Sequence, residues 1–193
     1  MVKYLNTKLI MTLKDLHIDS TWTLFLDRDG VINKKLEDDY VKHTSEFEFI
    51  DGTLNALRML DPLFKTIVVV TNQQCIGKKI IYPEDLELIH KNMLYEISYL
   101  KGRIDKIYYS PYLASENHPT RKPEIGMALQ AQKDFPNIDF NKSIIVGDSL
   151  SDMEFGRNAG MKTVYISNEA KDDARIDFNF RSLIYFAHTL TVK

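Results

Sequence analysis

The chain has 193 residues, of which 44% are hydrophobic and 27% are charged. This length suits one α/β domain with a sizeable buried core. The 25 Lys and Arg nearly balance the 27 Asp and Glu, so the formal net charge is only −2. Such a balance gives no electrostatic footprint for nucleic acid or an anionic membrane, and neither is predicted as a partner.

Signals for export, membrane insertion or a disulfide framework are missing from the sequence. Apolar runs such as Thr66–Val70 are too short to span a bilayer. The segment Met1–Leu13 lacks the hydrophobic core and the cleavage site of a signal peptide. The single cysteine, Cys75, excludes an internal disulfide and any multi-cysteine zinc site. We therefore expect a cytoplasmic protein.

Strand-like and helix-like segments alternate along residues 21–193, which are predicted to form one domain after an N-terminal extension of undecided structure, residues 1–20. Runs of β-branched and aromatic residues predict strands at Thr21–Leu26, Thr66–Val70, Ile104–Tyr109, Ser143–Val146 and Thr163–Ile166. Helical spacing predicts helices at Thr53–Leu60, Pro83–Leu100, Glu124–Phe135 and Leu150–Ala159. This alternation indicates an α/β fold of three layers with a Rossmann-like parallel sheet.

The polar stretch Gly30–Phe49 follows the first predicted strand and shows no sustained period. A long connection at the carboxyl end of a strand in such a sheet usually lies over the ligand crevice. A tolerated surface loop is the alternative, and composition alone does not separate the two. Its position directly after an acidic motif favours a place over the site.

That motif is Asp27-Arg28-Asp29-Gly30, at the end of the first strand. Two carboxylates this close together repel each other unless a positive charge lies between them. A divalent cation with oxygen ligands, such as Mg²⁺, supplies that charge. A β-turn with Asp and Gly at favoured positions explains the motif equally well when it is taken alone.

Three further polar segments shift the balance towards a functional site. Thr71-Asn72 ends the second strand, Asp148 and Asp152 follow the fourth, and Arg121-Lys122 precedes the helix predicted from Glu124. Two cations at that helix N-terminus would favour an anion. Because the loops of a parallel sheet gather at one edge, these groups predict a phosphate-and-metal site.

These four segments resemble, in their correct order, the four motifs of the haloacid dehalogenase superfamily. The motifs are Asp27-x-Asp29-Gly30-Val31, Thr71-Asn72, Lys122-Pro123 and Gly147-Asp148-x-x-x-Asp152. Further segments resemble D-glycero-D-manno-heptose 1,7-bisphosphate phosphatases and the related histidinol-phosphatases. They include Asp27–Asn33, Tyr40-Val41, Phe47–Gly52, Val69–Gln73, Ile107–Tyr109 and Arg121–Pro123. The resemblance covers roughly Thr21 to Ile166 and implies a phosphatase of this fold. The stretches between Gly30 and Thr66 and between Asn72 and Arg121 have room for a flap and ordinary crossover elements only, so no large cap domain is expected.

The resemblance implies a role for each acidic residue. Asp27 would be the nucleophile that forms an aspartyl-phosphate, and Asp29 would be the general acid and base. The latter role calls for a carboxyl pKa nearer neutrality than that of a free Asp. Mg²⁺ would bind the Asp27 carboxylate, the Asp29 backbone carbonyl and Asp148. Asp152 would orient Lys122 or a metal-bound water, although an acid in the first turn of a helix is an equally good explanation.

The same resemblance assigns the phosphate contacts. Thr71, the backbone N–H of Asn72 and Lys122 would hold the phosphoryl oxygens. Arg121 would reach the substrate, where its fork suits a second phosphate. Arg28 is more consistent with a structural ion pair. Cys75 follows the Thr-Asn pair, and a small residue filling a tight space is the simpler explanation than an oxidation-sensitive thiol.

The chain departs from the family in the segment before Arg121. Many relatives carry a zinc loop there, but Ser110–Thr120 contains no cysteine and a single histidine, His118. Zinc is therefore not predicted as a cofactor. Ser149 stands where heptose bisphosphate phosphatases commonly have a lysine. Both departures leave the exact substrate open.

The leading hypothesis is a Mg²⁺-dependent phosphomonoesterase that removes the 7-phosphate of D-glycero-D-manno-heptose 1,7-bisphosphate. Histidinol phosphate or another small phosphorylated metabolite is the alternative substrate. A receiver-like module that stores a phosphoryl group on Asp27 is the alternative outside enzymes, and Asp29 argues against it. We expect a monomer or a small homo-oligomer.

Overall fold

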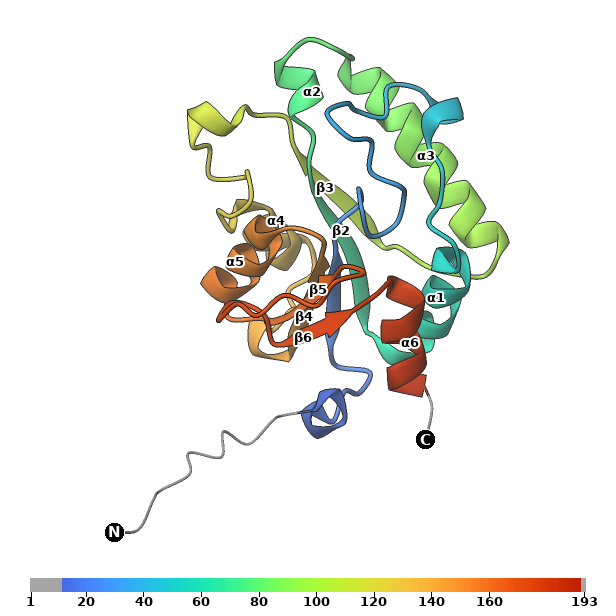
Figure 1. Cartoon of the computed structure of the whole chain (residues 1–193), viewed down its shortest axis with the longest axis vertical. Coiled ribbons are helices and arrows are strands. Elements are labelled where there is room, and N and C mark those ends of the chain that lie inside the picture. Colours follow the sequence, from blue (N-terminus) through green and yellow to red (C-terminus); the bar gives the residue numbers. More distant parts are fainter. Residues whose placement is uncertain (1–11, 192–193) are drawn as a thin grey trace.

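The computed structural model describes residues 12–191. Six strands form one fully parallel sheet in the order β3-β2-β1-β4-β5-β6 (Figure 1). The strands are β1 (Thr23–Leu26), β2 (Thr66–Asn72), β3 (Lys106–Ser110), β4 (Ser143–Gly147), β5 (Lys162–Ile166) and β6 (Phe178–Phe180). The helices are α1 (Thr53–Leu60), α2 (Gln74–Gly77), α3 (Pro83–Tyr99), α4 (Gly126–Asp134), α5 (Leu150–Ala159) and α6 (Leu183–Thr191). The predicted α/β fold with a Rossmann-like parallel sheet and no large cap is confirmed.

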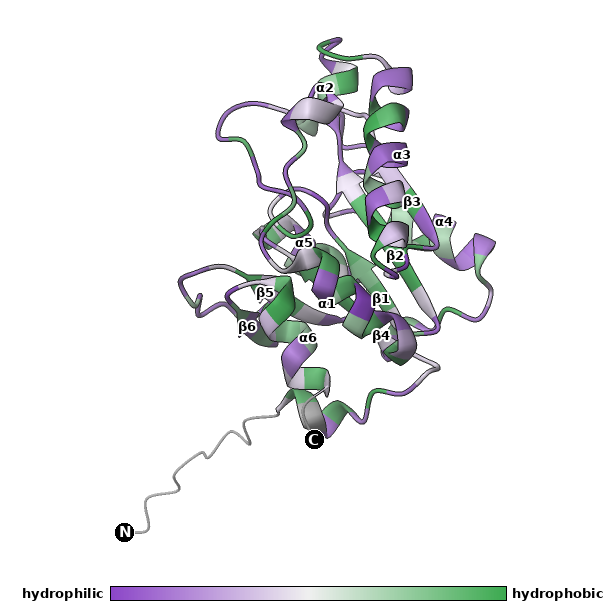
Figure 2. Cartoon of the chain, turned by 90° about the vertical axis from the view of Figure 1, so that its right-hand side faces the viewer, coloured by the Kyte–Doolittle hydropathy of each residue, from purple (hydrophilic) through white to green (hydrophobic). Residues whose placement is uncertain are grey.

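Helices cover both faces of the sheet, which explains why the central strands are apolar on both sides. Leu24 and Leu26 of β1 point to the core shared with α1, α3 and α6, whereas Phe25 points to the core shared with α4 and α5. Figure 1 shows these two helical layers on opposite sides of the sheet. Along α3, hydrophobic and hydrophilic residues alternate in Figure 2, as expected for a helix with one buried face.

The strand order determines where the site lies. β1 pairs with β2 on one side and with β4 on the other, so the chain reverses its direction of winding between β1 and β4. Ligands of open parallel sheets bind outside the carboxyl ends of the strands at this switch point. Asp27 directly follows β1, Thr71 and Asn72 end β2, and Asp148 directly follows β4. The loops that carry the acidic motifs therefore converge there.

Several elements differ from the sequence-based expectation. β6 and α6 lie in a region that the sequence left unassigned, and they extend the sheet and its helical layer. α4 begins at Gly126 instead of Glu124, so Arg121 and Lys122 do not lie at its first turn. The residues before Gly126 form turns instead, in which the Glu124 N–H donates to the Arg121 carbonyl and the Gly126 N–H donates to the Pro119 carbonyl, each at 2.8 Å.

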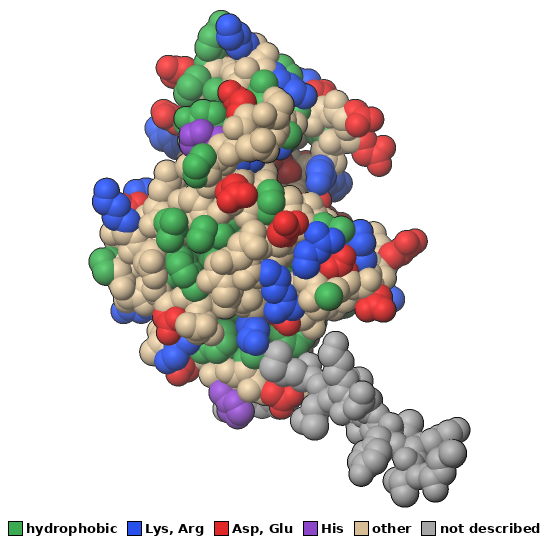
Figure 3. Space-filling view, turned by 90° about the vertical axis from the view of Figure 1, so that its left-hand side faces the viewer, with side chains coloured by type: hydrophobic (Ala, Val, Ile, Leu, Met, Phe, Trp, Pro, Cys, Tyr) green, Lys and Arg blue, Asp and Glu red, His purple; other side chains and the backbone are tan. Residues whose placement is uncertain are grey.

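The N-terminal region contributes to the core where it is described. A 3-10 helix spans Leu13–Leu16, and Leu13 is buried in the core that α6 lines. The division into an extension, 1–20, and a domain, 21–193, stays a prediction, and residues 1–11 of that extension lie outside the described region. Within residues 12–191, no helix combines the length and the apolarity needed to cross a membrane. Basic and acidic side chains are interspersed on the face shown in Figure 3.

Candidate active site

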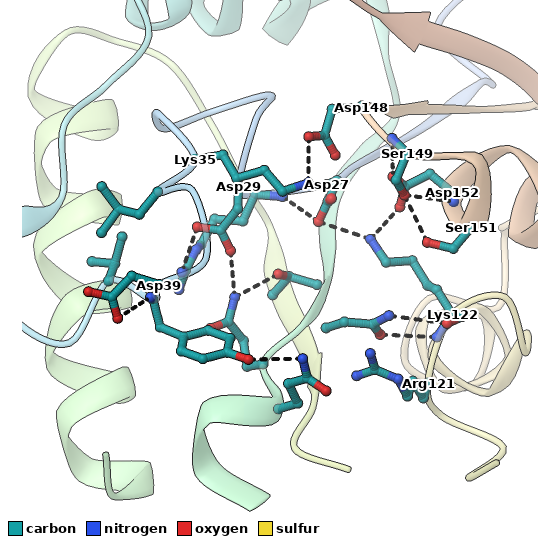
Figure 4. A pocket seen from close by; sticks show the side chains of 18 residues that line it. Asp27, Asp29, Lys35, Asp39, Arg121, Lys122, Asp148, Ser149, Ser151 and Asp152 are labelled. Carbon is teal, nitrogen blue, oxygen red and sulfur yellow. Dashed lines mark hydrogen bonds and ion pairs between the residues drawn. The ribbon is translucent and has the colours of Figure 1, made fainter. Parts of the chain in front are cut away.

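A cavity of about 260 Å³ opens at the carboxyl ends of β1, β2 and β4 (Figure 4). Its lining includes every residue that the sequence analysis singled out for catalysis, phosphate binding or metal binding. These residues are Asp27, Asp29, Thr71, Asn72, Arg121, Lys122, Asp148 and Asp152. Lys35, Leu36 and residues Asp39 to Val41 of the long connection line the same cavity, so this connection does lie over the site. The structure thus brings together groups from four separate segments.

Asp27 lies at the centre of the cavity with one oxygen held and one oxygen open. Its Oδ1 accepts a hydrogen bond from the backbone N–H of Arg28 at 2.7 Å and lies 2.9 Å from the Lys122 ammonium. No donor from residues 12–191 contacts its Oδ2. Burial, and the nearby Asp152 and Asp148 carboxylates, raise the pKa of Asp27 to about 7 although Lys122 opposes this shift.

Lys122 is buried, and its ammonium contacts two carboxylates and a backbone carbonyl. Its ammonium lies 2.9 Å from Asp27 and 2.5 Å from Asp152, and it donates to the Val70 carbonyl at 2.7 Å. Asn72 holds the backbone of Lys122 through two hydrogen bonds of its side-chain amide. The two carboxylates raise the pKa of Lys122 despite its burial, so this side chain is a fixed positive charge. A backbone clamp from β2 therefore fixes where that charge lies.

Asp152 both contacts Lys122 and caps the start of α5, the two roles between which the sequence analysis did not decide. Its Oδ1 pairs with Lys122, whereas its Oδ2 accepts from the backbone and the hydroxyl of Ser149 in a capping box at the start of α5. Gly147 makes room for it, because a Cβ there would lie 2.2 Å from the Asp152 Cβ. The carboxylate thus stabilises the helix start and orients the lysine at the same time.

Asp29 is held by three side-chain donors. Arg28 and Asn33 donate to its Oδ1, each at 2.9 Å, and Gln73 donates to its Oδ2 at 2.8 Å. Burial alone would raise the pKa of Asp29, but Arg28 and the hydrogen bonds to Asn33 and Gln73 outweigh it and lower that pKa. The expectation of a pKa near neutrality for this carboxyl is therefore wrong in the free protein. The lowered pKa of Asp29 comes first from the adjacent Arg28 and then from hydrogen bonds of Asn33 and of the distant Gln73.

Asp148 has one oxygen paired and one without a partner. Lys35 donates to its Oδ2 at 2.8 Å, across the mouth of the cavity. Its Oδ1 is buried, and no donor in the described part of the chain reaches it. Carboxylate oxygens of Asp27, Asp148 and Asp152 lie within 4.8 Å of one another. Such a cluster, with one buried oxygen left unpaired, fits a hard divalent cation.

Arg121 and Tyr40 mark the outer part of the cavity. Arg121 donates to the Tyr112 carbonyl at 3.0 Å, and its half-buried guanidinium lines the cavity. The Tyr40 hydroxyl accepts from Gln74 and Lys78, each at 2.9 Å, which ties the long connection to the region of α2.

Other residues that the sequence raised lie away from the cavity centre. Cys75 is fully buried, and burial raises the pKa of its thiol, which argues against an oxidation-sensitive residue. His118 stacks on Tyr112 with 3.3 Å between ring centroids and contacts the Thr120 hydroxyl at 2.8 Å. Both residues therefore have packing partners that account for them.

Sequence reasoning missed three contributors to the site. Lys35, Gln73 and His90 contact Asp148, Asp29 and Arg28 respectively. Gln73 directly follows the Thr-Asn pair, so its place in the site could have been predicted from the sequence. The other two are brought to the site by folding alone, from a loop without periodicity and from the buried face of α3.

Comparisons with known proteins agree with this geometry. The model of the family described as polynucleotide kinase 3 phosphatase matches residues 23–192. A D-glycero-alpha-D-manno-heptose-1,7-bisphosphate 7-phosphatase of Mycobacterium bovis is 36% identical over 170 residues, which cover 86% of this chain and 90% of that relative. The protein of the same name from Campylobacter jejuni is 37% identical over 163 residues, covering 84% of this chain and 92% of the relative.

Solved structures show the same relationship. The D,D-heptose 1,7-bisphosphate phosphatase of B. bronchiseptica, complexed with magnesium and phosphate, superimposes with a TM-score of 0.80 at 25% identity. This match covers 88% of the present chain and 97% of that protein. A putative HAD-like phosphatase of Mesorhizobium loti gives a TM-score of 0.76 at 26% identity, with 91% and 90% of the two chains covered.

The sheet order, the acidic residues after β1 and β4, and the buried lysine between them define a haloacid dehalogenase-like phosphatase. The chain matches the polynucleotide kinase 3 phosphatase family model and belongs to the family of the D-glycero-D-manno-heptose-1,7-bisphosphate 7-phosphatases.

Proposed function

We propose that the protein hydrolyses the 7-phosphate of D-glycero-D-manno-heptose 1,7-bisphosphate with Mg²⁺ as cofactor and Asp27 as nucleophile. The names of the relatives support the substrate, since four of them at 36–37% identity act on the alpha form of this bisphosphate. The observation that carries the chemistry is the state of Asp27, whose Oδ1 is fixed by Arg28 N–H and Lys122 while Oδ2 is open.

Asp27 Oδ2 attacks phosphorus, and the bond to the leaving oxygen of the sugar breaks. The result is a phosphoryl group on Asp27, which water then removes in a second step. The fixed orientation of the carboxylate supports this role because a positioned nucleophile needs little reorganisation to attack. Lys122 places a permanent positive charge beside the developing negative charge, which stabilises the transition state.

Asp29 acts next to the leaving oxygen. Because its pKa is lowered in the free protein, it must take up a proton as the phosphorylated substrate binds. It passes that proton to the leaving oxygen in the first step and takes a proton from the attacking water in the second. Its three donors hold the carboxylate at the edge of the cavity, where Gln73 also contacts the Thr71 hydroxyl at 2.9 Å. Thr71, the Asn72 backbone N–H and Lys122 hold the phosphoryl oxygens.

Mg²⁺ fits the residues that are present. The Asp27 and Asp148 carboxylates, with the backbone carbonyl of Asp29, would hold the ion, and the unpaired Oδ1 of Asp148 is the oxygen left for it. Asp152 also belongs to the acidic cluster, but we place it outside this set because the Lys122 ammonium lies 2.5 Å from its Oδ1 and Ser149 donates to its Oδ2. Bound Mg²⁺ offsets the charge of the carboxylates and of the phosphoryl oxygens.

Arg121 explains why the substrate would be a bisphosphate. Its guanidinium lines the outer cavity, on the side away from the acidic cluster, so it can bind a second phosphate while the first lies at Asp27. We infer that Arg121 binds the phosphate that stays on the sugar. The protein would then act in the cytoplasm on a small metabolite, as a monomer or a small homo-oligomer.

The test is phosphate release with Mg²⁺ from the alpha and beta forms of the heptose bisphosphate, from histidinol phosphate and from an aryl phosphate. Asp27→Asn serves as the inactive control. We expect a strong preference for a heptose bisphosphate, with loss of the 7-phosphate alone, and a raised KM for Arg121→Met on this substrate only. A preference for histidinol phosphate would overturn the substrate, and undiminished activity of Asp27→Asn would overturn the chemistry.

A further inference from the structure

Arg28 stands between Asp27 and Asp29 in the sequence, and it is among the largest fully buried side chains of the described residues. Its NH2 group donates to Asp29 Oδ1 at 2.9 Å, and its NH1 group lies 3.1 Å from His90 Nε2. Its Nε is buried with no acceptor among residues 12–191. A buried guanidinium is costly unless its donors are paired, so Asp29 and His90 together decide where this group lies.

His90 is itself held firmly. It lies on the buried face of α3 with 7% of its surface exposed, and its ring packs edge-on against Tyr109 of β3 at 6.2 Å between centroids. Burial and the Arg28 charge lower the pKa of His90 to about 3. The neutral ring keeps a lone pair on Nε2, which accepts from Arg28 when the proton is on Nδ1.

The contacts of Asp29 are unevenly divided between its two oxygens. Oδ1 accepts from Arg28 and Asn33, whereas Oδ2 accepts from Gln73 alone. A carboxylate oxygen has room for two donors, so Oδ1 is filled and Oδ2 retains one free position. The oxygen that can exchange a proton with the substrate is therefore Oδ2, and Arg28 helps to set the direction in which it points.

We propose that His90 is a positioning residue for the phosphatase reaction, because it anchors Arg28 and thereby fixes the orientation of the Asp29 carboxylate. This proposal rests on the proposed function, in which Asp29 protonates the leaving oxygen. No described side chain of α3 lines the catalytic cavity, yet through His90 and Arg28 this helix would affect proton transfer. Without His90, the NH1 group would have no acceptor among residues 12–191, and the guanidinium and Asp29 would shift together.

The test uses the leaving group. A sugar alkoxide needs a proton as it departs, whereas the anion released from dinitrophenyl phosphate does not. Formation of the phosphoryl-enzyme is measured in single turnovers with enzyme in excess. For His90→Leu we expect a loss of about 10- to 100-fold on the heptose bisphosphate and less than about threefold on dinitrophenyl phosphate. His90→Gln keeps an acceptor near the place of Nε2 and should recover most of the rate.

A matched control distinguishes the loss of the contact with Arg28 from a general loss of core packing. Met93→Ala also empties a buried position of α3, in the hydrophobic core, and should lower the melting temperature without separating the two substrates. Equal losses of His90→Leu on both substrates, or failure of His90→Gln to recover activity, would show that His90 supports the fold alone and would overturn the proposal.

A double-variant comparison separates this proposal from the proposed function. If His90 acts through Asp29, Asp29→Asn and Asp29→Asn/His90→Leu should have the same rate on the heptose bisphosphate. Losses that multiply would overturn the positioning role of His90. If Asp29→Asn itself fails to distinguish the two leaving groups, the assignment of Asp29 as general acid is wrong, and the result bears on the proposed function instead.

Discussion

Lys122 and Asp152 form an ion pair of 2.5 Å although neither side chain is more than 2% exposed. The same ammonium lies 2.9 Å from Asp27, so one lysine compensates two buried carboxylates. Buried pairs contribute little when intact, because desolvation opposes the attraction, but loss of one partner leaves an uncompensated charge. The site therefore depends on Lys122 for stability as well as for catalysis.

Lys122→Met should abolish measurable activity and lower the free energy of unfolding by roughly 3–5 kcal/mol at neutral pH, because two carboxylates lose their counter-charge. Urea unfolding of the apoprotein measures this. Adding Asp152→Asn to Lys122→Met should recover part of the lost stability and none of the activity. A Lys122→Met protein as stable as the parent would contradict the arrangement.

The raised pKa of Asp27 makes the stability of the metal-free protein depend on pH. Its value is about 7 in the folded state against an ordinary 3.8, so the folded protein binds a proton that the unfolded chain releases. This contribution is present in full below about pH 4 and is lost as pH rises through about 7. Asp27→Asn should remove the dependence and stabilise the apoprotein by roughly 1–3 kcal/mol at pH 8.

Unfolding of both proteins across pH 4–8 in a chelator checks this prediction. Equal stability at pH 8, or a parent protein that becomes more stable over this interval, would contradict the raised pKa. Mg²⁺ should abolish the loss of stability of the parent protein at high pH, since binding of the ion requires the ionised carboxylate.

Lys35 bears on metal affinity. Its ammonium lies 2.8 Å from Asp148, so it opposes the approach of a second cation to the same carboxylate. Lys35→Met should tighten Mg²⁺ binding to the apoprotein by roughly three- to tenfold in calorimetry. Lys34→Met is the matched control, since Lys34 is next to Lys35 in the sequence but pairs with Glu48 on the surface. Weaker binding by Lys35→Met would mean that Lys35 holds Asp148 in place for the metal instead.

Position 147 requires glycine because any side chain there would clash with Asp152. A methyl group at this position would lie 2.2 Å from the Asp152 Cβ, which forces the carboxylate away from Lys122. Gly147→Ala should therefore lower kcat by about 100-fold and cost roughly 1–3 kcal/mol of stability. Gly160→Ala has open space around it but a φ of +86°, so it should cost stability without loss of kcat. Comparable kcat losses in the two variants would contradict a specific role for Gly147.

The sequence predicted the parts of the fold with a strong period. Thr53–Leu60 and Leu150–Ala159 are helices with the predicted bounds, because their apolar spacing and the stop at Gly160 are local signals. β6 was not predicted, because a strand of three residues with no fully buried side chain shows no period. α6 lies in the same C-terminal stretch, for which no assignment was made.

In the site, strand ends could be read from the sequence and long-range partners could not. Asp27, Thr71 and Asp148 follow or end predicted strands, so their convergence follows from the parallel sheet. The contact of Lys35 with Asp148 joins residues 113 positions apart, and that of His90 with Arg28 joins residues 62 apart. The pKa of Asp29 was predicted in the wrong direction because the sequence does not show that the Arg28 side chain turns back onto this carboxylate, nor that the distant Gln73 reaches it.

The most direct test of the account is the covalent state of Asp27 during turnover. The protein is mixed with Mg²⁺ and heptose 1,7-bisphosphate, quenched in acid within a turnover, and its peptides are examined by mass spectrometry. We predict a transient phosphoryl group on Asp27, absent from Asp27→Asn, while the 7-phosphate alone disappears from the sugar. Phosphate release with no modification of Asp27, or with the phosphoryl group on another residue, would contradict the account.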